Sequence, residues 1–264
     1  MYQHITSLKN PKIKNLIRFQ KPRVRHDEGL FVIEGTKEIE RAYDAGYRFV
    51  SLFWYPGMLS EEKMKNYASE QTGIIEISRE IFEKVTYRGN TGGLLVVAEQ
   101  KSHINPDKLN FKSEPLIVVL ESVEKPGNLG AILRTADAAG VDAVIVCDQQ
   151  TDIYNPNVIR SSIGCLFTVS VFQASSEYVI SFLKSNGINI YCAALTASVP
   201  YHTINYKHGS AIVLGTEATG LTQKWLAAST QNIIIPMQGI ADSLNVSTSA
   251  AITLFEAKRQ RGFY

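Results

Sequence analysis

The sequence predicts an α/β protein whose larger, C-terminal domain contains a mostly parallel sheet. From residue 116 onward, short apolar runs alternate with helical segments, and this alternation is typical of strands joined by right-handed helical crossovers. The first run, residues 116–120, is apolar throughout, as a parallel strand that is covered on both faces requires. A smaller α/β domain is expected before it.

The smaller domain is assigned to residues 1–100. It begins with a basic, amphipathic helix in which Ile13, Leu16 and Ile17 recur at helical spacing. Another helix is expected after Gly35. Three strands are expected, at residues 30–33, 49–54 and 93–98. The polar residues 101–114 are predicted to form a linker.

The C-terminal domain is assigned to residues 115–264. Its further strands are expected at residues 143–146, 188–193, 211–214 and 233–235. A break at Pro126-Gly127 and a helix-ending Gly140 predict a helix at residues 132–139. A last helix is expected at residues 246–259.

The composition excludes several classes of protein. The chain has 264 residues, 45% of them hydrophobic and 20% charged, which is ordinary for a globular protein of one or two domains. Its three cysteines and five histidines lack the spacing of metal ligands or of a disulfide framework, so we expect no metal. Neither a signal peptide nor a membrane-length apolar run is visible, so we expect a cytoplasmic protein without membrane contact.

The N-terminal residues are basic, although the net charge of the chain is only +2. Residues 1–25 contain lysines and arginines but no acidic residue, which fits binding to a nucleic-acid backbone. A solvated helix face is the alternative interpretation. The candidate binding residues are Lys9, Lys12, Arg18, Arg23 and Arg25.

Three polar segments of the C-terminal domain each follow an expected strand. They are Asn128-Leu129-Gly130-Ala131-Ile132-Leu133-Arg134, Gly215-Thr216-Glu217-Ala218-Thr219-Gly220-Leu221 and Ser243-Leu244-Asn245-Val246-Ser247. In an open α/β sheet, ligands bind beyond the carboxyl ends of the strands. The three segments therefore predict one composite site.

Each segment also has a purely structural interpretation. Asn128 suits the N-cap of a helix, and Ser243 or Asn245 suits the N-cap of the last helix. Gly215 and Gly220 suit a tight turn.

Arg134 is less easily explained by structure alone. It lies among small and apolar residues, and a cation in such surroundings needs a partner. An ion pair with Asp137 or Glu121 is one interpretation, and binding of an anion is the other.

Three other classes of site are disfavoured. Gly215 and Gly220 have a spacing that resembles a phosphate-binding P-loop, but Leu221 stands where such a loop needs lysine. The absence of G-x-G-x-x-G argues against a Rossmann nucleotide site. Ser243 lacks the G-x-S-x-G context of a hydrolase nucleophile.

The order and the residues of the three segments resemble the SpoU (TrmH) branch of the SPOUT RNA methyltransferases. The matching motifs are N-x5-R, G-T-E-x-x-G-L, and I-P-M followed by D-S-L-N-V-S, and they span the region from residue 116 to the C-terminus. The N-terminal part more loosely resembles the substrate-binding domain, similar to ribosomal protein L30e, that often precedes this catalytic domain. Its cues are Ser7-Leu8-Lys9-Asn10-Pro11-Lys12 and Phe31-Val32-Ile33-Glu34-Gly35, whereas residues 88–93 depart from the pattern of related chains.

The resemblance implies a SPOUT fold, in which the C-terminal segment threads a loop to form a trefoil knot, and a homodimer. It also implies S-adenosyl-L-methionine as the cofactor and a ribose 2′-hydroxyl of RNA, with no DNA partner, as the methyl acceptor. The L30e-like domain favours ribosomal RNA over transfer RNA. The alternatives are a transfer-RNA 2′-O-methyltransferase and a non-catalytic RNA-binding or ribosome-assembly protein that has kept the fold.

The resemblance also assigns roles to residues. The catalytic face is expected to contain Asn128, Arg134, Glu217, Ser243 and Asn245. Arg134 is expected to clamp an RNA phosphate and to stabilise the developing alkoxide rather than to act as a base, because the pKa of arginine exceeds about 12. Glu217 is expected to fix Arg134 or Asn128. The cofactor is expected to lie against Leu195, Thr196, Gly215, Thr216, Gly220, Ile235, Met237 and Leu244.

Overall fold

The structure is a computed structural model that describes residues 2–86, 92–101 and 113–263. The chain divides into two compact units. The first contains Met1–Ser102 and Asp152–Thr168, and the second contains His103–Thr151 and Val169–Tyr264. The segment Asp152–Thr168, which the predicted boundaries assign to the C-terminal domain, thus contacts mainly the N-terminal unit. Most of the predicted linker and of residues 88–93 lies outside the described residues.

The first unit is a five-stranded mixed sheet with helices. The strand order is β1-β4-β3-β5-β2, and β5 is antiparallel to both β2 and β3. The strands are β1 (Gln3–Ile5), β2 (Leu30–Glu34), β3 (Phe49–Trp54), β4 (Gly73–Ile77) and β5 (Leu94–Glu99). The helices are α1 (Pro11–Arg18), α2 (Pro22–Glu28), α3 (Thr36–Asp44), α4 (Glu61–Lys65), α5 (Arg79–Val85) and the short α7 (Pro156–Ser161).

The second unit contains a seven-stranded sheet in which all neighbouring strands are parallel, which confirms the predicted fold class. The strand order is β10-β12-β9-β11-β6-β7-β8. The strands are β6 (Leu116–Glu121), β7 (Ala143–Cys147), β8 (Val171–Ala174), β9 (Asn189–Ala193), β10 (Ser198–Pro200), β11 (Ser210–Leu214) and β12 (Gln231–Ile234). Every residue of the central strands β6 and β11 is buried, because helices cover both faces.

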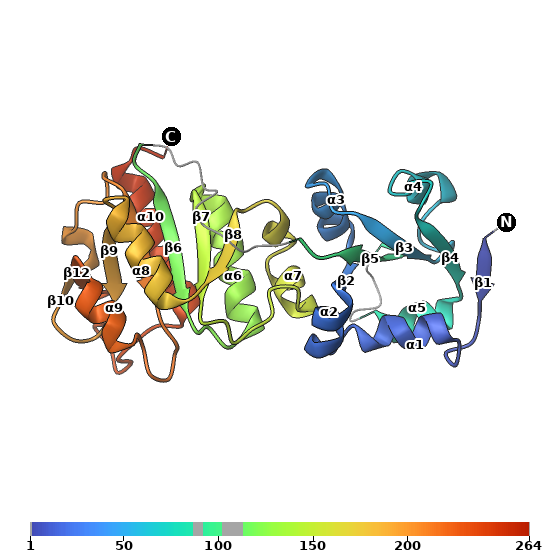
Figure 1. The fold of residues 1–264 in the computed structure, drawn as a ribbon, viewed down its shortest axis with the longest axis horizontal. Coiled ribbons are helices and arrows are strands. Elements are labelled where there is room, and N and C mark those ends of the chain that lie inside the picture. The colour runs from blue at the N-terminus through green and yellow to red at the C-terminus, as the bar shows by residue number, and fades with distance from the viewer. Residues whose placement is uncertain (1, 87–91, 102–112, 264) are drawn as a thin grey trace. The chain divides into compact units, whose positions relative to one another are not determined.

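The helices of the second unit form one layer on each face of the sheet (Figure 1). Helices α8 (Ser176–Ser185) and α9 (Gln223–Ala228) bury Val179, Leu183 and Trp225 against one face. Helices α6 (Pro126–Ala139) and α10 (Val246–Gln260) pack against each other beside the opposite face. None of the described helices is long and apolar enough to cross a membrane.

Helix α6 begins six residues before the predicted start. Pro126 opens the helix rather than breaking the chain before it, because its fixed φ and missing N–H suit the first helical position. The helix ends as predicted, with Gly140 at a φ of 57°. Asn128 consequently lies in the first turn, and the N-cap is Lys125.

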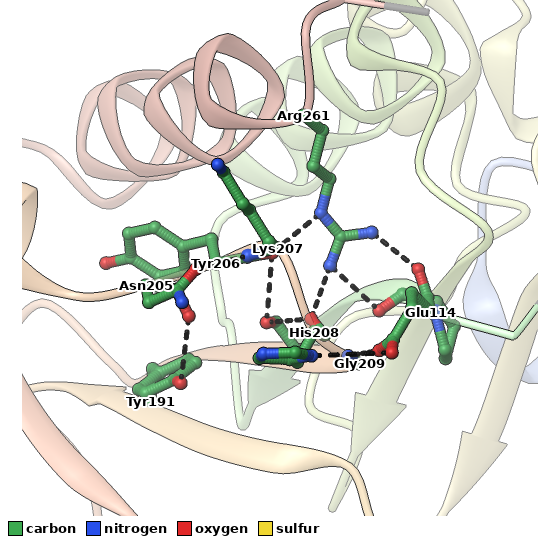
Figure 2. Close-up of polar contacts among 10 residues, drawn as sticks. Glu114, Tyr191, Asn205, Tyr206, Lys207, His208, Gly209 and Arg261 are labelled. Carbon is green, nitrogen blue, oxygen red and sulfur yellow. Dashed lines mark hydrogen bonds and ion pairs between the residues drawn. The ribbon is translucent and has the colours of Figure 1, made fainter.

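Arg261, which follows α10, joins three segments that lie far apart in the sequence (Figure 2). Its guanidinium donates hydrogen bonds to the carbonyl oxygens of Glu114 (2.5 Å), Tyr206 (2.8 Å) and His208 (2.7 Å). These carbonyls stand just before β6 and β11. Burial lowers the pKa of Arg261 from its ordinary value, as desolvation of a cation must. We call this arrangement the Arg261 clasp.

We expect Arg261→Met to lower the free energy of unfolding by roughly 2–3 kcal/mol, because several carbonyls would lose a charged donor while remaining partly buried. The matched control is Arg259→Met. Arg259 is exposed and, among the residues that the structure describes, its side chain pairs with Glu256 on the same helix, so its loss should cost less than about 1 kcal/mol. Urea denaturation compares the two variants, and equal midpoints would contradict the clasp.

Candidate active site

Three loops that carry predicted site residues meet at one edge of the parallel sheet. Strands β12, β9 and β11 are neighbours, so their carboxyl ends lie side by side. The loop after β9 carries Leu195 and Thr196, the loop after β11 begins at Gly215, and the loop after β12 carries Ile235 and Met237. The sheet thus brings together, at one edge, residues that the resemblance assigns to cofactor binding.

The loop from Gly215 to Gly220 is a tight turn. Thr216 and Gly220 exchange two backbone hydrogen bonds of 3.2 and 3.1 Å. Gly220 has a φ of +68°, and a Cβ on Gly215 would lie 2.3 Å from the carbonyl oxygen of Gly220. Glycine is therefore required at position 215 for close packing and favoured at position 220 by the backbone conformation. The structural interpretation of these glycines holds.

The surface beside this turn is apolar and incompletely covered. Leu195 is 63% exposed and Leu244 is 37% exposed. Asn232, on β12, donates a hydrogen bond of 3.4 Å to the carbonyl of Thr196. Its Oδ1 is buried and has no hydrogen-bond partner among the described residues. A bound ligand would cover the exposed leucines, and it would donate a hydrogen bond to the Oδ1 of Asn232.

A polar cluster stands next to the turn. The Oε1 of Glu217 accepts hydrogen bonds from the side-chain amides of Asn128 (2.8 Å) and Asn245 (2.6 Å), and its Oε2 pairs with Lys125. The amide of Asn245 also donates to the Oδ1 of Asn128 at 3.2 Å. We call these four residues the Glu217 cluster. It joins the start of α6, the loop after β11 and the start of α10.

Asn245 caps the last helix, as one interpretation of the sequence predicts, and its amide also contacts Glu217. Its Oδ1 caps α10 by accepting a hydrogen bond of 2.9 Å from the backbone N–H of Ser247. The cap leaves its amide nitrogen free to contact Glu217. The helix cap therefore fixes the orientation of the group that faces the cluster.

Lys125 was not predicted as a site residue. Its ammonium is the main reason why the pKa of Glu217 lies below the ordinary value, and the bond from Asn128 adds to the effect. The sequence prediction missed it because it placed the start of α6 six residues too late and because Glu217 lies 92 positions away. Lysine at the start of a helix opposes the helix dipole, and the carboxylate of Glu217 offsets that effect here.

Of the two partners expected for Glu217, the structure places Asn128 against its carboxylate and leaves Arg134 outside the cluster of its own chain. Arg134 is exposed and forms no hydrogen bond or ion pair with the residues that the structure describes. It follows Asn128 by six positions, or about 9 Å along the axis, and projects from a different side of α6. Neither predicted ion pair forms, and Glu121 instead accepts two hydrogen bonds from Thr222 (2.8 and 2.7 Å).

Ser243 also stands apart from the Glu217 cluster. Its hydroxyl donates to the carboxylate of Asp242 at 3.2 Å. It is exposed, two residues before the cap of α10. Ser243 and Asn245 can act on the same substrate only if that substrate is large enough to contact both side chains.

Arg25 corrects the predicted RNA-binding set. Its side chain is fully buried in the first unit, where it pairs with Asp152 (2.6 Å) and donates to the carbonyl of Phe19 (2.6 Å). A cation that is buried and paired in this way cannot contact a phosphate backbone. The other four candidates are exposed on or beside α1 and α2, and they are Lys9, Lys12, Arg18 and Arg23.

Comparison with known families gives two matches that together cover most of the chain. Residues 115–255 match the SpoU rRNA Methylase family. Residues 10–96 match the MRM3-like substrate binding domain.

Similar proteins include two kinds of RNA methyltransferase. A 23S rRNA (guanosine(2553)-2′-O)-methyltransferase of Bacillus subtilis is 30% identical over 97% of this chain and 99% of its own length. A tRNA (guanosine(18)-2′-O)-methyltransferase of Escherichia coli is 37% identical, but over 59% of this chain and 68% of its own length.

Solved structures with the same fold include two close matches. A crystal structure of an RNA 2′-O ribose methyltransferase has a TM-score of 0.85 and 39% identity, and the match covers 98% of this chain and 99% of that one. An AdoMet-bound rRNA methyltransferase from Sinorhizobium meliloti has a TM-score of 0.89 and 30% identity, with 98% of each chain covered.

We expect Gly215→Ala to lower the free energy of unfolding by about 1–3 kcal/mol, because the added methyl would overlap the backbone of Gly220. Gly239→Ala is the matched control, since nothing lies within 4 Å of a Cβ at that position, and it should change stability by less than about 0.5 kcal/mol. Chemical denaturation separates the two. A Gly215 variant as stable as the control would show that the turn opens at little cost.

Proposed function

This chain belongs to the SpoU rRNA methylase family, and we propose that it transfers a methyl group from S-adenosyl-L-methionine to a ribose 2′-hydroxyl of ribosomal RNA. The observation that carries the proposal is the Glu217 cluster, which lies beside the glycine turn at the carboxyl edge of the sheet. The ribosomal RNA relative aligns over nearly its whole length and the transfer-RNA relative over only part of this chain, which favours ribosomal RNA.

The residues at the sheet edge fit the cofactor. The close approach of Gly215 to Gly220 exposes backbone groups rather than side chains, and the exposed leucines offer apolar contact. The buried Oδ1 of Asn232 has no donor among the described residues. When bound, the cofactor supplies an electrophilic methyl group. The residues proposed to hold it are Leu195, Thr196, Gly215, Thr216, Gly220, Ile235, Met237 and Leu244.

The cluster would position the ribose rather than remove its proton. A ribose hydroxyl is a weak nucleophile, so alignment with the methyl group contributes much of the rate. Glu217 has Oε1 and Oε2 engaged by three donors, which suits a positioning residue better than a general base. The amides of Asn128 and Asn245 would orient the ribose with the hydroxyl of Ser243. The RNA phosphate or a water would take the proton.

We further infer that the protein works as a homodimer in which Arg134 serves the site of the second copy. Arg134 is exposed and reaches no group of the cluster in its own chain. A guanidinium brought by a second copy would clamp an RNA phosphate and stabilise the developing alkoxide. The exposed Phe255, on the neighbouring helix α10, offers apolar surface for such a contact.

The proposal extends to a trefoil knot, to an RNA-binding surface on the first unit and to the location of the protein. After β12, two strands away from β11, the chain returns to pack α10 against α6 and β11, which supports the trefoil knot of SPOUT proteins. The exposed Lys9, Lys12, Arg18 and Arg23 would contact the RNA backbone. The proposal includes a cytoplasmic location, which is also expected from the sequence.

Incubation with methyl-labelled cofactor and bacterial RNA that lacks its ribose methylations should yield a new 2′-O-methylnucleoside, identified by mass spectrometry. Arg134→Ala should lower the rate by about 100-fold or more, because the developing charge loses its donor. A methylated base instead would overturn the mechanism. RNA binding without any transfer would favour a non-catalytic assembly protein, and transfer only to transfer RNA would overturn the choice of substrate.

Mixing two inactive variants tests the homodimer. Arg134→Ala and Asn245→Ala damage different parts of the site, so an equal mixture should regain about one quarter of the wild-type rate if Arg134 acts on the second copy, because half the dimers are mixed and each has one intact site. Activity after co-refolding is the measurement. A mixture as inactive as its components would mean that both residues serve the same chain.

A further inference from the structure

We propose that Lys125 binds the RNA phosphate next to the ribose that is methylated. The inference rests on the proposed function and adds to it a substrate-binding residue that neither the motifs nor the comparisons assign. A nucleotide within RNA has a phosphate on either side of its ribose, so Arg134 and Lys125 could each engage one. The argument for Lys125 comes from its contacts, its exposure and its backbone.

Glu217 does not need Lys125 to hold its orientation. One carboxylate oxygen already accepts hydrogen bonds from the amides of Asn128 and Asn245, at 2.8 and 2.6 Å. Two donors from different helices define the plane of the carboxylate without a third. The ammonium therefore adds charge to the cluster more than it adds geometry.

The ammonium of Lys125 has N–H donors that Glu217 does not use. An ammonium group has three such donors, and among the described residues the ammonium of Lys125 contacts Glu217. The side chain of Lys125 is 68% exposed. Its remaining donors face solvent, where an acceptor from a bound RNA could reach them.

The backbone of Lys125 is held firmly, so the side chain projects from a fixed point. Its carbonyl accepts hydrogen bonds from the backbone N–H groups of Asn128 (3.0 Å) and Leu129 (3.2 Å). Pro126 follows it and restricts both its own φ and the conformation of the residue before it. A rigid base of this kind suits a residue that must meet a phosphate at a defined place.

A cation at this position offsets the charge of Glu217. A glutamate carboxyl ionises at about pH 4.3 without any help from a neighbour, so Glu217 presents a carboxylate to the incoming RNA. A phosphate brought beside that carboxylate would be repelled. Among the described residues, Lys125 is the cation in contact with the cluster. Stability alone does not explain it, because exposed ion pairs contribute little and a lysine at a helix start is unfavourable.

The test measures RNA affinity as a function of salt for the full-length protein with Lys125→Gln, Lys125→Arg and Lys207→Gln. The probe is the ribosomal RNA that the wild type methylates. Loss of one phosphate contact should weaken binding severalfold and reduce the slope of log affinity against log salt by about 0.7 for a single strand or 0.9 for a duplex. Affinity for S-adenosyl-L-methionine should not change.

The other two variants are controls. Lys125→Arg keeps the charge and should keep the wild-type slope. Lys207→Gln removes the same charge from an exposed lysine at the opposite edge of the sheet, before β11, and should also keep that slope.

A second measurement needs no variant. RNA should slow the acetylation of Lys125 in the wild-type protein, followed by mass spectrometry, and should leave that of Lys207 unchanged. The proposal is overturned if Lys125→Gln keeps the wild-type slope and loses only turnover, since the lysine would then merely position Glu217, or if RNA leaves Lys125 unprotected. A wild type that binds RNA but methylates no ribose would refute the proposed function instead.

Discussion

The parallel pairing of β11 between β6 and β9 is the constraint on which the site depends. All three strands are parallel and have buried centres, so the loops that follow them leave from one edge of the sheet. The glycine turn extends from β11 and the first turn of α6 follows β6. Reversing β6 or β11 would separate the groups that meet at Glu217, and reversing β9 would remove Leu195 and Thr196 from this edge of the sheet.

Glu217 connects three segments at this edge of the sheet through its hydrogen bonds and its ion pair. Its carboxylate ties the beginning of α6 to the beginning of α10, and each helix start is shaped by its own local rule. Pro126 sets the first helix, and the side chain of Asn245 caps the second. The side chains of the Glu217 cluster are thus positioned by well-formed helix ends. Their structural and functional interpretations, which compete when the sequence is considered alone, are compatible in the folded chain.

The sequence predicted the buried centre of the fold better than its edges. The apolar runs of β6, β7, β9, β11 and β12 were recognised. The strands β8 and β10, which are the two short edge strands and contain polar residues or proline, were not predicted. The start of α6 was misplaced because a Pro-Gly pair can open a helix as well as end one. Arg25 was misassigned because its partner, Asp152, lies 127 positions away, and no local pattern reports such a pairing. Lys125 was missed because its anion comes from a distant loop.

The Arg261 clasp has a consequence for how the protein matures. Arg261 is synthesised after every strand of the sheet, and its acceptors precede two strands that leave the ribosome long before it does. The far end of helix α10 is held by Arg261 and by Gln260, whose side chain bonds Tyr206 and Ile204, and the near end of the same helix carries Asn245. The growing chain can assemble its sheet early, whereas α10 is tied to the segments before β6 and β11 only after its last residues have been synthesised.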